Sequence, residues 1–453
     1  MSMLRDPGPP PARTETDPAP RRGRPPARDE ILRHGRLGGM DPAELAARFG
    51  TPFYAYDLDV VSRQVEALGS VLPVQADLAF AVKANPNLSV LRHLAGAGLG
   101  ADVASAGELG QAIRAGFGPE RIVFTGPGKR DDELRAAVEA GVGVVTVESP
   151  GELRRLESIA AGLGRRQPIL LRAAVTEAAR LERVRLVGDD GAGKFGMDAA
   201  DLRVAAAEAV ASPWVDVLGL HAFGASNLLD AGALAAHAET TVDGAIALAA
   251  EAGFQLRLVD IGGGLGIPYE VQDEPLDVRR LGARLQALAD RLAGDRPTRA
   301  ARILLEPGRF LVGASGAYVA SVVDRKAVGG RHVVVLDGGI HHLVRPALVG
   351  QEHRLRVLTG PASTRSGANA QRFPVTVAGP LCSGLDVFAE AAVMSVPDVG
   401  DLVAVLDVGA YGATESMPFF LSHPLPPEIA LRGGAAWVAR PRIDPETWLG
   451  WQT

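Results

Sequence analysis

Leu78-Ala-Phe-Ala-Val-Lys-Ala-Asn85 is an apolar, strand-like run that contains one of only four lysines among 453 residues. A lysine in an apolar setting loses part of the solvation that favours its ammonium form. Its pKa is then expected to fall, and its amine can attack an aldehyde. We therefore interpret Lys83 as a candidate Schiff-base lysine. The alternative is an ordinary lysine whose charged end reaches solvent at a strand end, and the other polar residues decide between the two.

The lysine run is the first of eight short apolar or β-branched runs that alternate with segments of helical period. The runs span residues 78–82, 100–104, 121–125, 142–147, 168–174, 217–222, 256–261 and 301–305. The clearest helical segments span residues 131–140, 150–163, 201–211 and 230–252. Repeated β-α units indicate a parallel sheet, and eight of them over about 250 residues predict a (β/α)8 TIM barrel in an α/β protein.

Beyond Phe310 the pattern changes to strands joined by Gly/Pro turns, which predicts a separate C-terminal β domain, a sandwich or barrel. Its candidate strands span residues 317–323, 332–336, 373–377 and 402–406. Thr51-Pro-Phe-Tyr-Ala-Tyr56 is expected to add a strand to this domain. The predicted organisation is a disordered Pro/Arg-rich tail in 1–38, a strand of the β domain in 39–56, the cofactor-binding barrel in 57–308 and the β domain in 309–453.

Composition excludes several partners. A net charge of -6 and a pI near 5.9 give no basic footprint for nucleic acid or an anionic membrane surface. No apolar run approaches the ~20 residues of a transmembrane helix, and the first 30 residues lack the apolar core of a signal peptide. The single cysteine, Cys382, rules out an intrachain disulfide. These features predict a cytoplasmic protein.

Several polar residues fall at the C-terminal ends of the predicted barrel strands, the face on which TIM barrels build active sites. They are Lys83, Asp102, Arg172, His221 and Glu306. Each has a structural explanation when taken alone, such as a helix cap, a core histidine or an ion pair between the arginine and the glutamate. Their shared face favours a functional interpretation.

The run Gly262-Gly-Gly264 follows the seventh predicted strand, and glycines let backbone N–H groups approach an anion closely. The run is neither a P-loop nor a dinucleotide-binding fingerprint. Together with the lysine, a carboxylate and a histidine it suggests pyridoxal 5'-phosphate. The lysine would form the Schiff base, the glycines would bind the phosphate, the carboxylate would pair with the pyridine nitrogen, and the imidazole would lie against the ring.

From about Thr51 to Glu428 the chain resembles the fold-type III pyridoxal-phosphate decarboxylases, which include the diaminopimelate and ornithine decarboxylases. The resemblance is carried by ordered motifs: Phe80-Ala-Val-Lys-Ala-Asn85, Ala101-Asp-Val-Ala-Ser105, His221-Ala-Phe-Gly-Ala-Ser-Asn227, Asp260-Ile-Gly-Gly-Gly264, Glu306-Pro-Gly-Arg309, Gly379-Pro-Leu-Cys382 and Gly409-Ala-Tyr-Gly412. It implies an alanine-racemase-like barrel followed by a β domain, and a lyase of amino-acid metabolism.

The resemblance also implies roles for individual residues. Lys83 would hold the cofactor, His221 would stack on its ring, and Glu306 would pair with its protonated nitrogen. The other expected cofactor-binding residues are Asp102, Arg172, Ser226, Gly263, Gly264, Gly308, Arg309 and Tyr411. The expected substrate-binding residues are Arg309, Arg345, Ser383 and Tyr411. No metal is expected.

Cys382 would act as the acid that returns a proton to the α-carbon. The resemblance implies that it does so in the active site of a partner subunit, in a homodimer with shared active sites. Asp386 and Lys194 would pair near that interface.

The segment Asp337-Gly-Gly-Ile-His-His-Leu-Val-Arg-Pro-Ala-Leu348 resembles the diaminopimelate branch. That branch has a tyrosine where Val349 stands, and both branches have an acidic residue where Ser383 stands. A site built for a charged ammonium group is penalised if that group has no partner. We therefore expect an amino-acid substrate whose far end is neutral, acidic or conjugated, or bound to a carrier protein, as in siderophore or other secondary-metabolite pathways.

Three alternatives remain. The first is a true diaminopimelate decarboxylase of lysine biosynthesis. The second is an amino-acid racemase, but racemases of this fold place an arginine at the pyridine nitrogen, where this chain has Glu306. The third is a non-catalytic cofactor-binding regulatory protein, but such proteins lack the β domain or lose the residues that correspond to Lys83 and Cys382.

Overall fold

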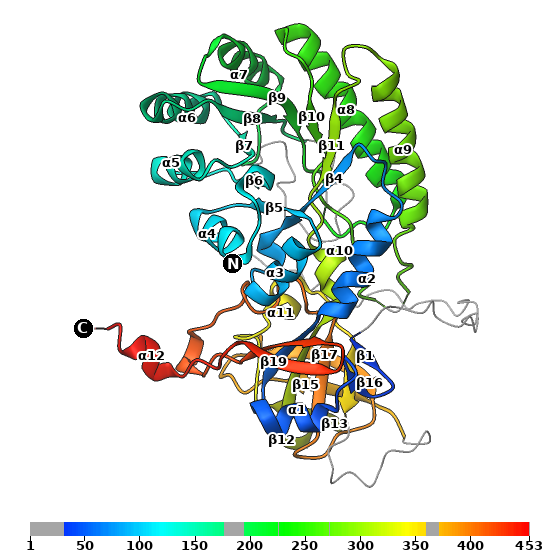
Figure 1. Cartoon of the computed structure of the whole chain (residues 1–453). Coiled ribbons are helices and arrows are strands. Elements are labelled where there is room, and N and C mark those ends of the chain that lie inside the picture. The colour runs from blue at the N-terminus through cyan, green and yellow to red at the C-terminus, as the bar shows by residue number, and fades with distance from the viewer. Residues whose placement is uncertain (1–30, 176–193, 225, 271, 359–370, 453) are drawn as a thin grey trace, which may run out of the picture.

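The computed structural model describes residues 31–175, 194–224, 226–270, 272–358 and 371–452. Figure 1 shows a barrel ringed by helices, with a β domain packed against one end of it. The strands of the barrel lie at its centre and the helices cover its outside. Of the helices that the structure describes, none has both the length and the apolar character needed to cross a membrane.

Eight parallel strands close the barrel in the order β10-β11-β4-β5-β6-β7-β8-β9, as the alternating pattern predicts. Their bounds are β4 Ala76–Ala81, β5 Gly100–Val103, β6 Ile122–Phe124, β7 Val144–Val147, β8 Gln167–Arg172, β9 Val215–His221, β10 Leu258–Asp260 and β11 Arg302–Leu305. A small apolar cluster of strand residues, including Ala79, Val123 and Leu170, is separate from the main core, as expected for side chains that fill a barrel.

Helices alternate with these strands, and local sequence explains where several of them begin and end. Their bounds are α2 Leu58–Gly69, α3 Leu88–Gly96, α4 Ala106–Ala115, α5 Asp131–Ala140, α6 Pro150–Leu163, α7 Ala199–Ala211, α8 Ala231–Ala252 and α9 Val278–Gly294. In α6, the Ser149 side chain accepts from the Glu152 backbone N–H, and Gly164 ends the helix in the left-handed conformation. Such caps fix the short turns that follow each strand, where the polar residues lie.

The C-terminal domain is built on a nine-stranded mixed sheet. Its main path is β16-β15-β13-β12-β3-β18-β19, while β17 pairs with both β12 and β14. Their bounds are β3 Phe53–Asp57, β12 Gly316–Val328, β13 Arg331–Leu336, β14 Leu355–Leu358, β15 Phe373–Ala378, β16 Val387–Met394, β17 Leu402–Leu406, β18 Glu428–Arg432 and β19 Ala435–Arg440. The segment before the barrel therefore lies in the middle of a sheet made mostly of residues that follow the barrel.

Short elements complete the fold. They are β1 Leu32–Arg33, β2 Arg36–Leu37, α1 Pro42–Phe49, α10 Arg309–Val312, α11 Arg345–Val349, α12 Pro445–Leu449 and the 3-10 turns η1 Val82–Ala84, η2 Pro119–Arg121, η4 Gly313–Ser315 and η5 Phe420–Ser422. In Figure 1, α10 and α11 lie where the barrel meets the β domain.

Several sequence-based boundaries differ from the structure; the segment 39–56, predicted as a strand, contains α1 before β3. The predicted tail, residues 1–38, is wrong for its last eight residues, because β1 and β2 form a hairpin that buries Ile31 and Leu37 in a second core; residues 1–30 lie outside the described residues. The predicted strand at 317–323 continues to Val328 in a hairpin with β13. Its exposed, charged end lacks the apolar alternation by which strands are recognised.

Candidate active site

Lys83 lies in η1, directly after β4, at the mouth of the barrel. Its Nζ donates to Asp102 Oδ2 at 2.9 Å, and its side chain is 42% exposed whereas that of Asp102 is 1% exposed. Desolvation lowers the pKa of Lys83, but the nearby carboxylates of Asp102 and Glu306 raise it, and the net pKa lies above the usual lysine value. The predicted fall in the pKa of Lys83 is therefore wrong for the protein without its cofactor. The two nearby carboxylates outweigh the effect of burial.

Asp102 is held in place from a second side. Its other oxygen, Oδ1, accepts from Thr125 Oγ1 at 2.5 Å, and Thr125 follows β6, the next strand of the barrel. Burial and the charge of Glu306 raise the pKa of Asp102, while Lys83 lowers it. Asp102 and Thr125 thus fix the direction in which the lysine ammonium points.

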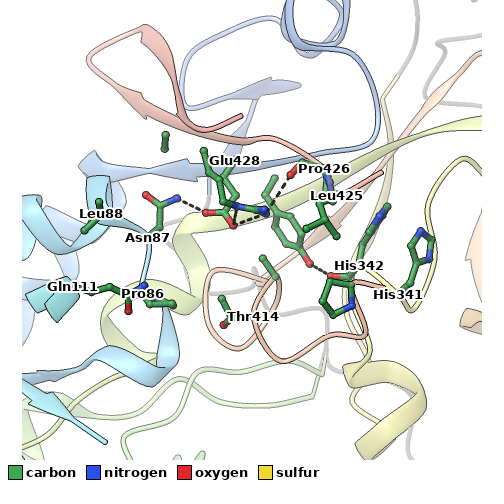
Figure 2. Close-up of a pocket in the computed structure, with 15 residues that line it drawn as sticks. Pro86, Asn87, Leu88, Gln111, His341, His342, Thr414, Leu425, Pro426 and Glu428 are labelled. Carbon is green, nitrogen blue, oxygen red and sulfur yellow. Dashed lines mark hydrogen bonds and ion pairs between the residues drawn. The ribbon is translucent and has the colours of Figure 1, made fainter. Parts of the chain in front are cut away.

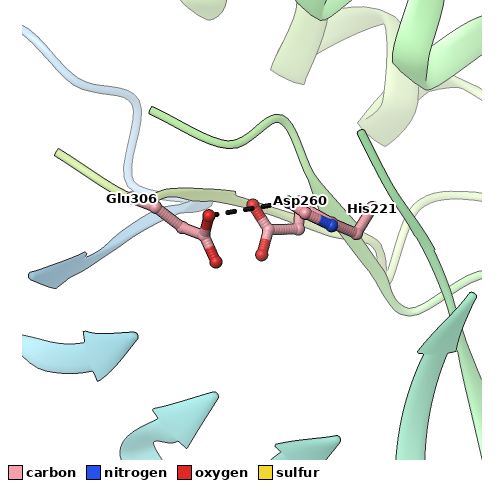
Figure 3. A group of neighbouring side chains, drawn as sticks. All are labelled: His221, Asp260 and Glu306. Carbon is pink, nitrogen blue, oxygen red and sulfur yellow. Dashed lines mark ion pairs between the residues drawn. The ribbon is translucent and has the colours of Figure 1, made fainter. Parts of the chain in front are cut away.

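His221, Asp260 and Glu306 form a buried group at the ends of β9, β10 and β11, the last of which pairs with β4 (Figure 3). His221 ends β9 and is in register with Asp260 on β10, and Glu306 directly follows β11. His221 Nε2 lies 3.5 Å from Glu306 Oε2. Four buried polar atoms of this group have no hydrogen-bond partner among the described residues: the two ring nitrogens of His221, Asp260 Oδ2 and Glu306 Oε1. The group is thus buried, polar and incompletely satisfied.

The two carboxyls of this group differ in their affinity for protons. Burial raises the pKa of Glu306, but His221, Lys83 and the neighbouring side chain of Asp260 lower it, to about 2 overall. Burial and the charge of Glu306 raise the pKa of Asp260 well above the ordinary value. Glu306 is therefore the ionised carboxylate of the pair.

Arg172 does not pair with Glu306, the partner that a structural explanation suggested. Its Nη1 donates to Glu148 Oε1 at 2.6 Å, and its guanidinium lies 4.8 Å from the ring centroid of Phe195. Glu148 also accepts from the backbone N–H groups of Gly126 and Gly196. Arg172 therefore belongs to a buried ion pair at the strand ends, and a contact with the cofactor stays a prediction.

The predicted glycines leave no room for side chains. A Cβ on Gly263 would lie 2.3 Å from the backbone oxygen of Glu306, and one on Gly308 would lie 2.9 Å from Ala84 Cβ. Gly262 and Gly264 have φ values of 67° and 87°, which favour glycine. The loops after β10 and β11 therefore approach one another as bare backbone, which suits an anion bound by N–H groups.

Arg309, Arg345 and Tyr411 come together beside this loop. The two guanidiniums lie 4.8 and 5.2 Å from the ring centroid of Tyr411. Arg309 Nη1 also donates to the hydroxyl of Tyr269 at 2.7 Å. The backbone N–H of Tyr411 donates to the oxygen of Ala84, next to the lysine. These contacts connect the β domain to the barrel mouth.

A cavity of about 130 Å³ opens beside the two arginines. Its wall includes Ser226, Tyr269 and Val349 as well as Arg309 and Arg345. Arg345 is not an unpaired cation: it donates through Nη1 to Glu415 and through Nε to Gln351, the latter at 3.1 Å.

A second cavity, of about 470 Å³, lies between the barrel loop after Lys83 and the β domain (Figure 2). On its wall, Asn87 donates to Glu428, and Arg440 Nε donates to the same carboxylate at 3.0 Å. Glu428 begins β18 and Asn87 caps α3, so this network ties the loop that carries the lysine to the sheet.

Cys382 and Ser383 lie away from the barrel residues, in the loop between β15 and β16. Cys382 is exposed, and Ser383 Oγ accepts from the backbone N–H of Leu385. Asp386 anchors the loop by accepting from the N–H groups of Ile340 and Leu381, both at 2.7 Å. The expected pairing of Asp386 with Lys194 stays a prediction.

The arrangement fits pyridoxal phosphate. It offers a lysine pointing into the mouth, an anion-binding glycine loop, and an ionised buried carboxylate with an oxygen not matched to a donor. Residues 58–313 match the family model described as the pyridoxal binding domain of pyridoxal-dependent decarboxylases. The chain belongs to this family.

Relatives of this decarboxylase agree with the match. A diaminopimelate decarboxylase of Zymomonas mobilis is 33% identical over 408 residues, covering 89% of this chain and 93% of the relative. The L-glutamyl-[BtrI acyl-carrier protein] decarboxylase of Niallia circulans is 32% identical, covering 88% and 94%. The structure of diaminopimelate decarboxylase from Helicobacter pylori complexed with L-lysine has a TM-score of 0.81 at 29% identity, covering 90% and 98%.

The chain is therefore a pyridoxal-phosphate-dependent amino-acid decarboxylase of the diaminopimelate decarboxylase type. When bound, the cofactor supplies an electron sink for the electrons released as the α-carboxylate leaves as CO2. The residues at the barrel mouth fit this chemistry: Lys83 can hold the cofactor, and the ionised Glu306 can keep its ring nitrogen protonated. The racemase and regulatory alternatives find no support in these relatives.

Sequence reasoning missed several residues of this decarboxylase site. Thr125 and Asp260 lie within predicted strand runs, so the strand-end rule that identified Lys83 could have identified them too. Tyr269 and Glu415 lie in loops, and no local pattern indicates that they reach Arg309 and Arg345.

Proposed function

We propose that this decarboxylase acts on an amino acid whose far end carries no free ammonium group, because it is acylated or attached to a carrier. The observation that carries the proposal is the wall of the smaller cavity. Arg345, an expected substrate-binding residue, is paired with Glu415, and apolar Val349 lies on the same wall. The wall therefore presents an ion pair without net charge and an apolar surface to the far end of the substrate.

The acids on the same wall are engaged elsewhere. Asp273 accepts from the backbone N–H groups of Tyr269 and Glu270, and Glu270 itself accepts from Gln272. Glu352 is the remaining acid of the wall and lies in an exposed position. Ser383 stands where the family places an acidic residue. An ammonium group that lost its water here would gain little in return.

The relatives are compatible with the proposal without deciding it. The relative from Niallia circulans bears a name that specifies a glutamyl group on a carrier protein, and its identity to this chain is close to that of the diaminopimelate decarboxylase from Zymomonas mobilis. The second candidate function is therefore decarboxylation of free diaminopimelate.

We further propose that two copies of the chain share their active sites, with Cys382 of each copy serving as the acid that returns the proton to the α-carbon in the other. The thiol is exposed within its own chain, and large apolar side chains nearby, Leu348 and Leu385, are 60% and 67% exposed. Mixing inactive Lys83→Ala and Cys382→Ala proteins should restore activity through mixed dimers. A mixture that stays inactive although exchange of subunits is demonstrated would contradict the arrangement.

The substrate proposal is tested by CO2 release from a panel of free diaminopimelate, lysine, ornithine and arginine, side-chain acylated amino acids and a carrier-bound glutamyl group. Since an unpaired charged group costs roughly 1.5–3 kcal/mol, we expect kcat/KM to favour an acylated or carrier-bound substrate by about tenfold to a hundredfold. Efficient turnover of free meso-diaminopimelate would instead establish the second candidate.

A matched pair of variants sharpens this test. Val349→Tyr combined with Ser383→Glu should raise kcat/KM for diaminopimelate, because it restores a charged partner for the distal ammonium. Val349→Tyr combined with Ser383→Gln has nearly the same shape without the charge and should not. Glu352→Gln should leave turnover of the acylated substrates unchanged, and a loss confined to free diamino acids would mean that Glu352 binds the ammonium.

A further inference from the structure

Asp260 is a buried acid of the barrel mouth to which neither the sequence analysis nor the proposed function gives a role. We propose that Asp260 is a positioning residue that retains a proton and donates it in a hydrogen bond to Glu306, so that Glu306 stays an ionised carboxylate. The inference concerns the established decarboxylase chemistry and does not depend on which substrate is used.

The distances between the side chains carry the inference. A ring nitrogen of His221, a carboxyl oxygen of Asp260 and a carboxyl oxygen of Glu306 all lie within 4.8 Å of one another. All three side chains are buried. Asp260 Oδ2 and Glu306 Oε1 are both buried and have no hydrogen-bond partner among the described residues. Two carboxylates this close repel each other when buried, whereas a shared proton removes one charge and supplies the missing donor.

The backbone holds the carboxyl of Asp260 in place and fixes the loop that carries Glu306. Asp260 Oδ1 accepts from the N–H of Gly262 at 2.8 Å, which leaves Oδ2 as the oxygen that can carry the proton. The oxygen of Gly262 in turn accepts from the N–H of Glu306 at 2.9 Å. Gly262 thus joins the two loops, and the carboxyl of Asp260 cannot turn away without losing this hydrogen bond.

Charged groups from several elements face this pair. His221 on β9 approaches Glu306, and the ammonium of Lys83 after β4 also acts on it. The carboxylate of Asp102 on β5 raises the pKa of Asp260, so it favours the protonated form. His237 on α8 contacts the backbone oxygen of Ala222, next to His221, and burial lowers its pKa, so it adds no neighbouring cation. The ammonium of Lys83 and the ring of His221 therefore favour an ionised Glu306, whereas the carboxylates of Glu306 and Asp102 favour a protonated Asp260.

The consequence for the reaction is a fixed distribution of protons. A hydrogen bond donated to a carboxylate stabilises its ionised form. Glu306 can therefore pair with a protonated ring nitrogen without taking its proton. Without Asp260 as a donor, Glu306 would bind a proton more readily and would hold the ring proton less well.

The test compares two substitutions of Asp260. Asp260→Asn keeps one donor and one acceptor in nearly the same shape and should mimic the protonated acid. Asp260→Ala removes the donor. We expect the affinity of the apo-protein for pyridoxal phosphate, measured by fluorescence titration, to stay within about threefold for Asp260→Asn and to fall about tenfold to a hundredfold for Asp260→Ala. Asp132→Asn, on an exposed turn of α5, controls for the general effect of removing an acid.

Two further measurements separate positioning from a merely structural role. The acid limb of the kcat/KM profile should move to higher pH in Asp260→Ala, because the pKa of Glu306 rises, and should stay in place in Asp260→Asn. The infrared spectrum of the wild-type protein should contain the carbonyl stretch of a buried protonated carboxylic acid, which Asp260→Asn removes. This band decides the question even if Asp260→Ala fails to fold.

Three results would overturn the inference. One is an Asp260→Asn protein that loses cofactor affinity as strongly as Asp260→Ala. Another is the absence of the carbonyl band from the wild type. The third is saturable binding of zinc to the wild-type apo-protein in competition with the cofactor and dependent on Asp260, because a metal ligand would have to be an ionised carboxylate.

Discussion

The barrel mouth and the β domain bury titratable side chains in different ways. At the barrel strand ends, buried charges come in pairs, such as Lys129 with Glu152 at 2.7 Å and Arg172 with Glu148 at 2.6 Å. In the β domain, burial lowers the pKa of His341 to about 4 and, with the help of its neighbour His341, that of His342 to about 2. The first region therefore holds its charges in pairs, whereas the second combines such pairs, for example Arg354 with Asp407, with buried histidines that stay neutral.

The difference follows from what each region contributes. A site for a phosphate-bearing, charged cofactor requires fixed charges, and buried charges are tolerated only when partners and hydrogen bonds compensate their lost hydration. The β domain contributes part of the cavity wall, the ring of Tyr411 and the loop with Cys382. Neutral histidines fit among its buried residues without partners of opposite charge.

The largest expected effect concerns Lys83, the partly exposed charge at the mouth. Lys83→Ala should abolish CO2 release, because no other described amine is placed beside Asp102 and the glycine loop. Lys326→Ala, on the exposed part of β12, is the matched control and should behave like the wild type. CO2 release and the visible absorbance of lysine-linked cofactor are the measurements. A Lys83→Ala protein that retained this absorbance would show that another amine holds the cofactor.

The next effect tests whether the stability of the protein depends on both partners of a buried ion pair at the barrel mouth, Lys129 and Glu152. Lys129→Met should lower the free energy of unfolding by about 3–5 kcal/mol, because it leaves the buried carboxylate of Glu152 without its cation. Urea unfolding measures the change. Combining Lys129→Met with Glu152→Leu should recover much of the loss, since no lone charge remains. A double variant as unstable as Lys129→Met alone would mean that packing, and not charge, is responsible.

The smallest effect concerns pH and the β domain. Folded His341 resists protonation down to about pH 4, whereas in the unfolded chain it binds a proton below about 6.5. Stability from this residue is therefore complete above pH 6.5 and is lost as the pH falls towards 4, by about 1 kcal/mol per pH unit. His341→Asn should flatten the pH dependence of unfolding between these values. His332→Asn, on β13, is the control, and equal slopes for both variants would contradict the assignment.

The fold was largely predictable because its signals are local. Alternating apolar runs and helical segments repeat eight times, and all eight predicted strands close into the barrel. The helices predicted at 131–140 and 150–163 have the same bounds in the structure, since Gly141 and Gly164 end them. Prediction failed where burial depends on distant residues, as for Ile31 and Leu37, or where an exposed hairpin has no apolar face.

The site was predictable to the extent that strand ends and family motifs mark it. These signals led to Lys83, Asp102, His221, the glycine run and Glu306, which the structure brings to one end of the barrel. They could not reveal the partners of these residues. That Arg172 pairs with Glu148, and Arg345 with Glu415, depends on side chains that approach from other strands and loops.

The sequence by itself determined the type of fold, the family and the residues available for the chemistry, because these follow from periodicity and from motifs of adjacent residues. Only the tertiary structure decided the protonation states. The pKa of Lys83 lies above its ordinary value because Asp102, nineteen positions away, faces it. Glu306 is ionised beside Asp260 because the ends of β9, β10, β11 and β4 bring a histidine, two acids and a lysine together. Charge interactions depend on distance in space, and sequence spacing does not record that distance.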